Sequence, residues 1–177
     1  MLSENFILGM IAGEGSFHIV LESPTRQRPK FKITMYEGEI LRQMCLQLGV
    51  GSVSHDWGDR YSWHVQSKQD VKDLRNWVSN NMCDSFKLTD KFRQFELWSE
   101  GVDIIPDGRR PISKNDRERL VELSYEIPKS DTKDKDKSEW LQSVRSVNIY
   151  YCGAEKRNGG ECGNRVPTEN AKCRHHE

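Results

Sequence analysis

A short apolar segment with glycines at positions 9 and 13, followed closely by an alternating segment, constrains the fold of this chain more than any other feature. Residues 6–12 are apolar on all sides, and Ser3 and Glu4 before them suit the N-cap and first turn of a helix. Gly9 and Gly13 lie four residues apart, so they line one helix face and let another helix approach backbone to backbone. A helix that is apolar all round must be covered on both flanks. We therefore expect one flank in its own core and the other against a second partner.

Alternation of apolar and polar residues predicts two antiparallel hairpins after this helix. The four predicted strands span residues 16–22, 30–35, 53–57 and 60–66. Pro24 and Pro29 are expected to bracket the first turn, and Gly58-Asp59 the second. Three of the strands show a clear apolar face, formed by Phe17, Ile19 and Leu21, by Phe31, Ile33 and Met35, and by Tyr61, Trp63 and Val65.

Helical stripes complete the predicted order, which is α-β-β-α-β-β-α-α-α. They lie over 40–48 with a stop at Gly49, from Ser67, around 92–98 and from Ser113, and a short helix follows around 140–147. Hairpins with one apolar face imply a sheet with helices on one side and an open polar face on the other. The sequence therefore predicts an α+β fold in which a helix–hairpin unit occurs twice.

Charge is distributed unevenly along a chain whose formal net charge is zero, with 27 Lys and Arg against 27 Asp and Glu. Residues 23–50 hold five bases and two acids, a local net charge of +3. Four of these bases recur at every second position, so those within a strand point to one face: Arg26, Arg28, Lys30 and Lys32. A polyanion would meet this basic row and not the neutral sum.

Residues 7–17, Ile-Leu-Gly-Met-Ile-Ala-Gly-Glu-Gly-Ser-Phe, resemble the LAGLIDADG signature of homing endonucleases. The resemblance extends over the αββαββα order to about residue 127. It implies an antiparallel four-stranded saddle sheet with helices on one face. It also implies site-specific hydrolysis of phosphodiester bonds in double-stranded DNA by divalent-metal catalysis. Proteins of this family with a single motif are homodimers whose motif helices pack at the two-fold axis, which predicts a pseudo-palindromic target.

The resemblance assigns roles to individual residues. Glu14 is the expected catalytic acid and ligand of Mg²⁺ or Mn²⁺, and the family's lysine near the metals falls close to Lys87 and Lys91. One Glu is too few ligands for such an ion, so a second copy is needed to supply a pair. Ala12 stands where the family often has an acid, which leaves open a decayed member that binds without cleaving. The expected dimer interface comprises Leu8, Gly9, Ala12 and Gly13.

Polar rows on the open sheet face are the expected DNA contacts, because a basic ribbon fits the major groove and can reach phosphates or guanine edges. The predicted contacts are Ser16, His18, Glu22, Arg26, Arg28, Lys30, Lys32, Thr34, Arg60, Ser62, His64 and Gln66.

The last segment carries a C-x9-C-x10-C-x2-H pattern formed by Cys152, Cys162, Cys173 and His176. Thiolates and imidazole are the ligands of closed structural zinc sites. The segment resembles a small Cys3His zinc knuckle, with His175 as a competing ligand. A piece with so little apolar content cannot build a core, so a bound Zn²⁺ would explain how it folds.

The chain is expected to divide into an endonuclease domain (1–128), a charged linker with a short helix (129–149) and a zinc-knuckle tail (150–177). No apolar stretch approaches the length of a membrane span, and the odd cysteine count favours a reducing compartment. We expect an intracellular, cytoplasmic protein of a prokaryote or phage, with an organelle as the open alternative. Two other functions remain open: a non-catalytic sequence-specific DNA-binding regulator and an RNA-binding intron maturase.

Overall fold

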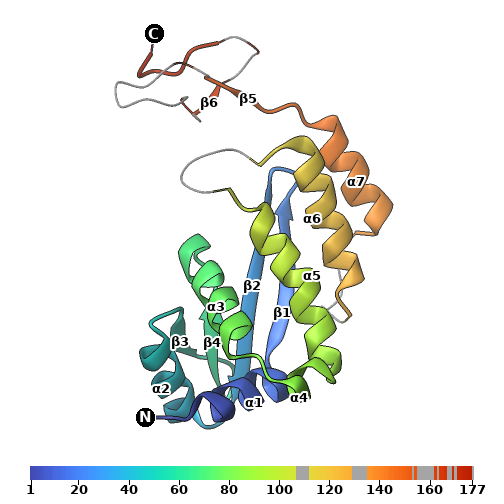
Figure 1. Cartoon of the computed structure of the whole chain (residues 1–177). Helices are drawn as coiled ribbons and strands as arrows, with labels where there is room; N and C mark the ends of the chain where they lie inside the picture. Colours follow the sequence, from blue (N-terminus) through green and yellow to red (C-terminus); the bar gives the residue numbers. More distant parts are fainter. Residues whose placement is uncertain are drawn as a thin grey trace.

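The computed structural model describes residues 1–106, 112–128 and 135–152, and in the C-terminal tail residues 154, 162, 164–166, 169 and 171–176. Within these residues a four-stranded sheet is covered on one face by helices (Figure 1). The helices are α1 (Glu4–Glu14), α2 (Gly38–Leu48), α3 (Lys68–Asn81), α4 (Asp84–Lys87), α5 (Asp90–Ile104), α6 (Lys114–Glu126) and α7 (Lys137–Ser146). The strands are β1 (Ser16–Ser23), β2 (Arg26–Met35), β3 (Ser52–His55), β4 (Tyr61–Val65), β5 (Tyr150–Tyr151) and β6 (Arg165–Val166).

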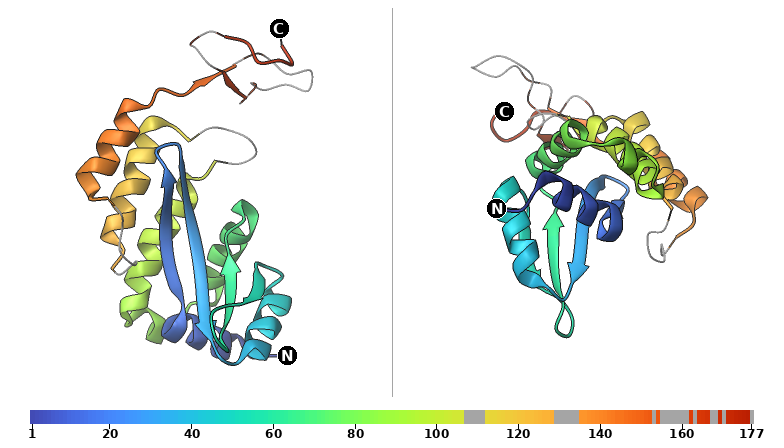
Figure 2. Two further views of the ribbon diagram at one scale, coloured as in Figure 1. Left: turned by 180° about the vertical axis from the view of Figure 1, so that it is seen from behind. Right: turned by 60° about the horizontal axis from the view of Figure 1, so that its bottom comes forward.

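The strands of the main sheet lie in the order β1-β2-β4-β3 and every neighbouring pair is antiparallel. In the left view of Figure 2 the strands lie nearest the viewer and the helical layer lies behind them. The sheet face turned toward the viewer is therefore the open one. Helix α1 crosses the foot of the sheet, where β1 begins (Figure 1). The predicted α+β architecture, with helices on one face, is confirmed.

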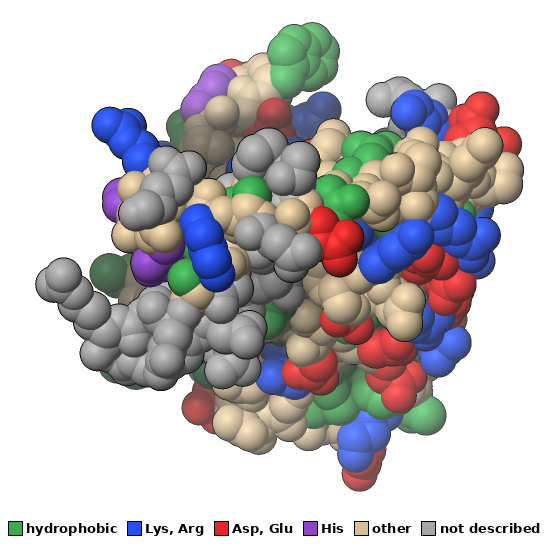
Figure 3. Space-filling view, turned by 90° about the horizontal axis from the view of Figure 1, so that it is seen from above, with side chains coloured by type: hydrophobic (Ala, Val, Ile, Leu, Met, Phe, Trp, Pro, Cys, Tyr) green, Lys and Arg blue, Asp and Glu red, His purple; other side chains and the backbone are tan. Residues whose placement is uncertain are grey.

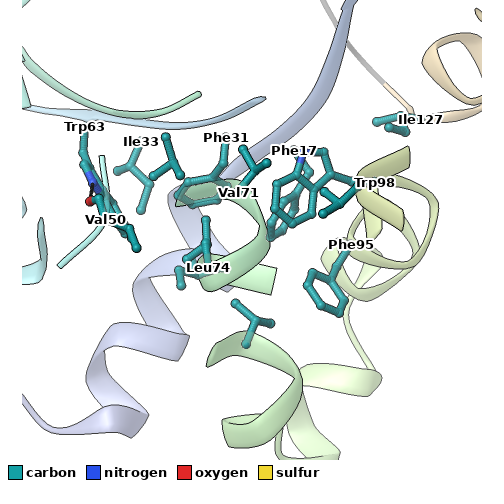
Figure 4. Packing of buried hydrophobic residues seen from close by; sticks show 14 of the residues in the cluster. Phe17, Phe31, Ile33, Val50, Trp63, Val71, Leu74, Phe95, Trp98 and Ile127 are labelled. Atoms are coloured by element: carbon teal, nitrogen blue, oxygen red, sulfur yellow. Dashed lines mark hydrogen bonds between the residues drawn. The ribbon is translucent and has the colours of Figure 1, made fainter. Parts of the chain in front are cut away.

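The core lies between the sheet and the helices and is rich in aromatic rings. Phe17 of β1 contacts Phe31 of β2 and Trp98 of α5, with ring centroids 4.9 and 5.0 Å apart (Figure 4). Trp63 of β4 extends the cluster, with its ring 5.5 Å from that of Phe31. All four side chains are buried. Burial of each such side chain contributes about 1.5–3 kcal/mol to stability, so this cluster ties both hairpins to the helical layer.

The predicted helix starts are confirmed by their capping hydrogen bonds. The Ser3 hydroxyl accepts from the backbone N–H of Phe6, and Ser67 and Ser113 cap α3 and α6 in the same way. Gly49 ends α2 with a φ of 67°, a conformation that suits glycine at a helix C-terminus.

The first turn differs from the prediction. It lies at Pro24 and Thr25, whereas Pro29 sits inside β2 opposite Ile19 of β1. On its other side, β2 pairs with β4 only from Phe31 onward, so Pro29 occupies an edge where a missing N–H is tolerated. The whole basic row therefore lies within β2. A second difference is the short helix α4, which the apolar pattern did not predict.

Two smaller packing units accompany the main core. Trp140 and Val144 of α7 pack against Val121 of α6. The tail has its own cluster, formed by Cys152, Cys162, Val166 and Cys173. Among the described residues no helix has the length and apolar character needed to cross a membrane.

Candidate functional site

Glu14 is the last residue of α1, and its side chain is exposed where the helix passes directly into β1. Gly15 makes this junction possible, since a Cβ there would come within 2.8 Å of Cε2 of Phe31. The N–H of Gly15 still bonds to the carbonyl of Ile11, 3.1 Å away. The carboxylate is thus presented by a rigid helix end and not by a loop.

Lys91, in the first turn of α5, lies beside this helix end. Its Nζ donates to the carbonyl oxygen of Gly15 and, at 3.3 Å, to Oε1 of Gln94. Burial lowers the pKa of Lys91, and the nearby Glu14 carboxylate acts in the opposite direction. An acid and a partly desolvated lysine therefore share one site, a pairing typical of catalytic groups.

Lys87 is placed differently from Lys91. Its Nζ pairs with Oδ1 of Asp84 at 3.0 Å, and its side chain is half exposed on α4. The structure thus brings only one of the two predicted lysines to Glu14, which the sequence spacing alone did not distinguish. Among the described residues, the only group of three or more metal-ligating side chains lies in the tail, so Glu14 offers a single acidic ligand.

The outward face of α1 carries open space over its two glycines. A Cβ added at Gly9 or Gly13 would meet no atom of the described residues within 4 Å, and Phe6 on the same helix is 41% exposed. Ala12 is partly buried, whereas Leu8 is only 3% exposed and belongs to the core of this chain. Of the four residues predicted for a dimer interface, Leu8 therefore points inward and the two glycines face outward.

The open face of the sheet carries the predicted polar rows. Gln27, Pro29, Phe31 and Ile33 are buried, so the residues between them in β2 face away from the helices. The strand register places Lys32 between Ser16 of β1 and His64 of β4. Arg60 and Gln66 lie just outside β4 and are exposed. The outward residues of β2 are Arg26, Arg28, Lys30, Lys32 and Thr34.

All four bases of this row are held by carboxylates of the same chain. Glu22 of β1 accepts from Nε of Arg26 at 2.9 Å, from the guanidinium of Arg28 and from Nζ of Lys30 at 3.3 Å. Lys32 donates to Oδ2 of Asp56 at 2.9 Å. Asp56 was missed by the sequence reasoning, which placed it within a strand. In the structure it lies in the turn between β3 and β4.

Ser62 is the predicted contact residue that is covered on the open face, where the register places it opposite Thr34. Its side chain has no exposed area, and its hydroxyl donates to Oδ2 of Asp56 at 2.6 Å. The hydroxyl of Thr34 lies 2.8 Å from that of Ser62. Ser62 therefore orients the Asp56 carboxylate through this hydrogen bond.

Two histidines lie on the same face. The pKa of His18 is lowered mainly by burial and further by Lys30 and Lys32. Burial and Lys32 also lower the pKa of His64. Both rings are thus kept neutral near pH 7, with one nitrogen as donor and one as acceptor.

The tail brings together its three thiols and one imidazole. The Sγ atoms of Cys152, Cys162 and Cys173 and a ring nitrogen of His176 all lie within 4.8 Å of one another. Nδ1 of His176 is 3.4 Å from Sγ of Cys152 and 3.3 Å from Sγ of Cys173. A hydrogen bond from Asn164 helps to lower the pKa of Cys173 to about 6, which favours the thiolate.

This donor set fits a tetrahedral zinc site. His176 and not His175 completes the group, and His175 is exposed. The backbone N–H of Cys173 donates to Sγ of Cys152 at 3.3 Å, as expected for a thiolate ligand held by its surroundings.

The fold is similar to solved LAGLIDADG homing endonucleases. An archaeal intron-encoded homing endonuclease, I-Vdi141I, complexed with DNA, is 26% identical, with a TM-score of 0.69 and a match to 80% of this chain and 94% of its own. The homing endonuclease I-TnaI is 16% identical, with a TM-score of 0.65 and a match to 83% and 99% of the two chains. The LAGLIDADG homing endonuclease I-SmaMI, bound to cleaved DNA, is also 16% identical, with a TM-score of 0.67 and a match to 94% of this chain but 53% of its own.

No family model matches the chain, and no curated protein sequence matches it. The assignment therefore depends on structure and motif together. An acid-terminated helix with glycines on its outer face, a four-stranded antiparallel sheet with one open polar face and the likeness to I-Vdi141I agree with one another. The chain has the fold of the LAGLIDADG homing endonucleases.

Proposed function

We propose that the chain is a site-specific DNA endonuclease that acts as a homodimer on a pseudo-palindromic duplex with divalent-metal catalysis. The observation that carries this proposal is the position of Glu14. The acid ends a helix with an open glycine face, and Lys91 is anchored to the next residue. The solved neighbours with this fold include homing endonucleases in complex with DNA.

Glu14 would hold Mg²⁺ or Mn²⁺, both of which prefer oxygen ligands. An ion held there would supply Lewis-acid activation of water and compensation of the charge that develops on the phosphate. Lys91 places a positive charge beside the carboxylate from a fixed position, held by the carbonyl of Gly15. Lys87 would be an auxiliary basic group. It could act at the phosphate only after its ion pair with Asp84 breaks.

The homodimer follows from the single acid of each chain and from the open face of α1. Gly9 and Gly13 allow a second α1 to approach closely, which would bring two Glu14 residues together at a two-fold axis. The length comparison is consistent with this arrangement. This chain matches about half of I-SmaMI, so two copies would span the length of the longer protein.

The open sheet face would contact the duplex. Lys32, His64 and Ser16 stand side by side across three strands, and the rest of the basic row continues toward the tip of the β1–β2 hairpin. Neutral His18 and His64 can both donate to and accept from base edges, whereas the arginines and lysines favour guanine and phosphate. Arg60 and Gln66 lie beyond the two ends of β4 and would widen the contact.

Glu14→Gln tests the mechanism, with Glu4→Gln as the matched control in the first turn of the same helix. The duplex probe is one that the unmodified chain selects from a randomised library. Glu14→Gln should abolish metal-dependent cleavage while leaving the affinity for the duplex nearly unchanged, and Glu4→Gln should cleave normally. Cleavage by Glu14→Gln at the rate of the unmodified chain would refute the assignment. Tight binding without cleavage by the unmodified chain would favour the regulator, and preferential binding of intron RNA the maturase.

We also propose that the tail holds one Zn²⁺ through Cys152, Cys162, Cys173 and His176. The convergence of these four ligand atoms supports it. Lys156 and Arg157, which would add positive charge to the tail, lie outside the described residues. A closed four-ligand site of this type has a structural role and leaves no position for catalysis.

A further inference from the structure

We infer that Glu22 and Asp56 are built-in counter-ions of the basic row, which orient its four side chains and suppress non-selective binding of DNA. This inference rests on the proposed function and names two residues that determine the selectivity of the same surface. Neither carboxylate is among the groups to which we assign cleavage, Glu14 and Lys91, and Glu22 lies toward the tip of the β1–β2 hairpin.

Glu22 contacts three bases at once. Its Oε2 accepts from Nε of Arg26, and its Oε1 accepts from Arg28 and from Nζ of Lys30. A carboxylate offers about four acceptor positions, so these contacts nearly fill it. The Glu22 side chain is 25% exposed, and hydrogen bonds from Arg28 are the main cause that lowers its pKa.

Asp56 holds the fourth base at the other end of the row. Lys32 donates to its Oδ2, and this oxygen also accepts from the buried hydroxyl of Ser62 at 2.6 Å. Its Oδ1 accepts from the backbone N–H of Trp57 at 3.0 Å. The Asp56 carboxylate is thus held by Ser62 and by the backbone of its own turn. An ordinary surface ion pair has no such additional hydrogen bonds.

These contacts leave donors free for DNA. Within the described part of the chain, Arg26 uses Nε for Glu22 and keeps its terminal nitrogens, and Arg28 keeps Nη1. Lys30 and Lys32 each have three N–H bonds, so both retain protons that can point outward. The bases can therefore reach guanine edges without leaving their carboxylates, in an arrangement that is already formed before DNA arrives.

The same contacts reduce the attraction of the row for phosphates. Four bases and two carboxylates leave a formal charge of +2 on this surface, half of what the bases alone would give. Non-specific affinity depends on how many phosphates a protein neutralises, whereas specific contacts gain from side chains that need no further ordering. Glu22 and Asp56 thus weaken non-specific binding to phosphates and favour specific contacts with the bases of the DNA.

The helical side of the molecule offers little compensating positive charge. Seen from the end that carries the tail, acidic and basic side chains alternate over α6 and α7 (Figure 3). Arg119 pairs with Glu100, Glu122 and Glu126, and Arg145 pairs with Glu118. Changes in the charge of the open sheet face should therefore control the binding of random DNA.

Glu22→Gln and Asp56→Asn test the inference, with Glu96→Gln as the control. Glu96 is exposed on α5, in the helical layer, and its replacement changes the net charge by the same amount. Each full-length variant is titrated at several salt concentrations against two probes: a duplex selected from a randomised library by the unmodified chain, and a scrambled duplex of equal composition. Thermal unfolding confirms that each variant is folded.

Glu22→Gln should bind the scrambled duplex at least about threefold more tightly and raise the salt slope by about 1 or more, as expected for an added phosphate contact. The ratio between the two affinities should fall. Asp56→Asn should change in the same direction by less, because it frees one base and not three. Glu96→Gln should match the unmodified chain on both probes.

Identical behaviour of Glu22→Gln and Glu96→Gln would overturn the inference while leaving the endonuclease proposal intact. So would a Glu22→Gln variant whose only change is its preference at one base pair, since Glu22 would then read a base such as cytosine directly. Failure of the unmodified chain to select any duplex from the library would refute the proposed function itself.

Discussion

At the scale of single residues, the decisive contrast lies between two lysines four positions apart. Lys91 is anchored at the end of α1, whereas Lys87 faces Asp84. We predict that Lys91→Ala lowers the cleavage rate by about 100-fold or more, the lower range for a positioned acid or base, with little change in DNA affinity. Lys87→Ala should keep most of the activity. Equal losses in single-turnover assays of the two variants would contradict this distinction.

The histidines of the open face make a prediction about pH. The pKa of His18 lies below its usual 6.5 because the ring is buried, so the unfolded chain takes up a proton at a higher pH than the folded chain. The stability contributed by the neutral ring is complete above about pH 6.5 and is lost as the pH falls toward the folded pKa. His18→Asn should therefore show a smaller loss of unfolding free energy between pH 7.5 and 5.5 in urea titrations. An equal loss in His18→Asn and in the unmodified chain would contradict this prediction.

Local chemistry accounts for what the sequence predicted at this scale. Glu14 was recognisable because glycines flank it at the junction of a helix and a strand, and the open-face bases because they alternate. The roles of Asp56 and Ser62 could not be recognised from the sequence, because they depend on the cross-strand register that places Ser62 opposite Thr34. The sequence could not distinguish the role of Lys91 from that of Lys87. The two lysines lie on different helices, Lys87 at the end of α4 and Lys91 at the start of α5.

At the scale of elements, the glycines of α1 and its junction predict opposite effects on fold and assembly. Gly15→Ala should destabilise the fold by about 1–3 kcal/mol, because its Cβ would press on the buried ring of Phe31. Gly9→Leu should leave the fold intact, since open space surrounds Gly9 and leucine favours a helix. It should nevertheless disrupt the proposed dimer. Thermal unfolding would measure the effect on stability, and sedimentation the effect on dimerisation. A Gly9→Leu chain that stays dimeric would show that α1 is not the interface.

Helix starts and hairpins were predictable because capping residues and alternation are properties of adjacent positions. The full length of β2 was not, because Pro29 suggested a turn and only the short reach of β4 explains why a proline is tolerated there. Element ends depend on neighbours in space, which a local pattern does not contain.

At the scale of the whole molecule, the main core and the tail are separate packing units. The buried cluster of the tail shares none of its described residues with the core between the sheet and the helices. In Figure 1 the tail lies beyond the tip of the β1–β2 hairpin, away from α1. We propose that it is a module whose folding depends on metal and not on the saddle sheet, because its few apolar side chains cannot stabilise it alone.

Metal removal should therefore unfold the tail and leave the rest of the chain folded. The zinc-loaded protein should contain one Zn²⁺ per chain, and a strong chelator should expose the tail to proteolysis without shifting the main thermal transition. Cys173→Ala should lose the zinc even at saturating metal, because three ligands no longer close the site. His175→Ala is the matched control and should retain it. Loss of zinc in both variants would show that His175 also binds the metal, and a fall of the main transition on chelation would show that the two units fold together.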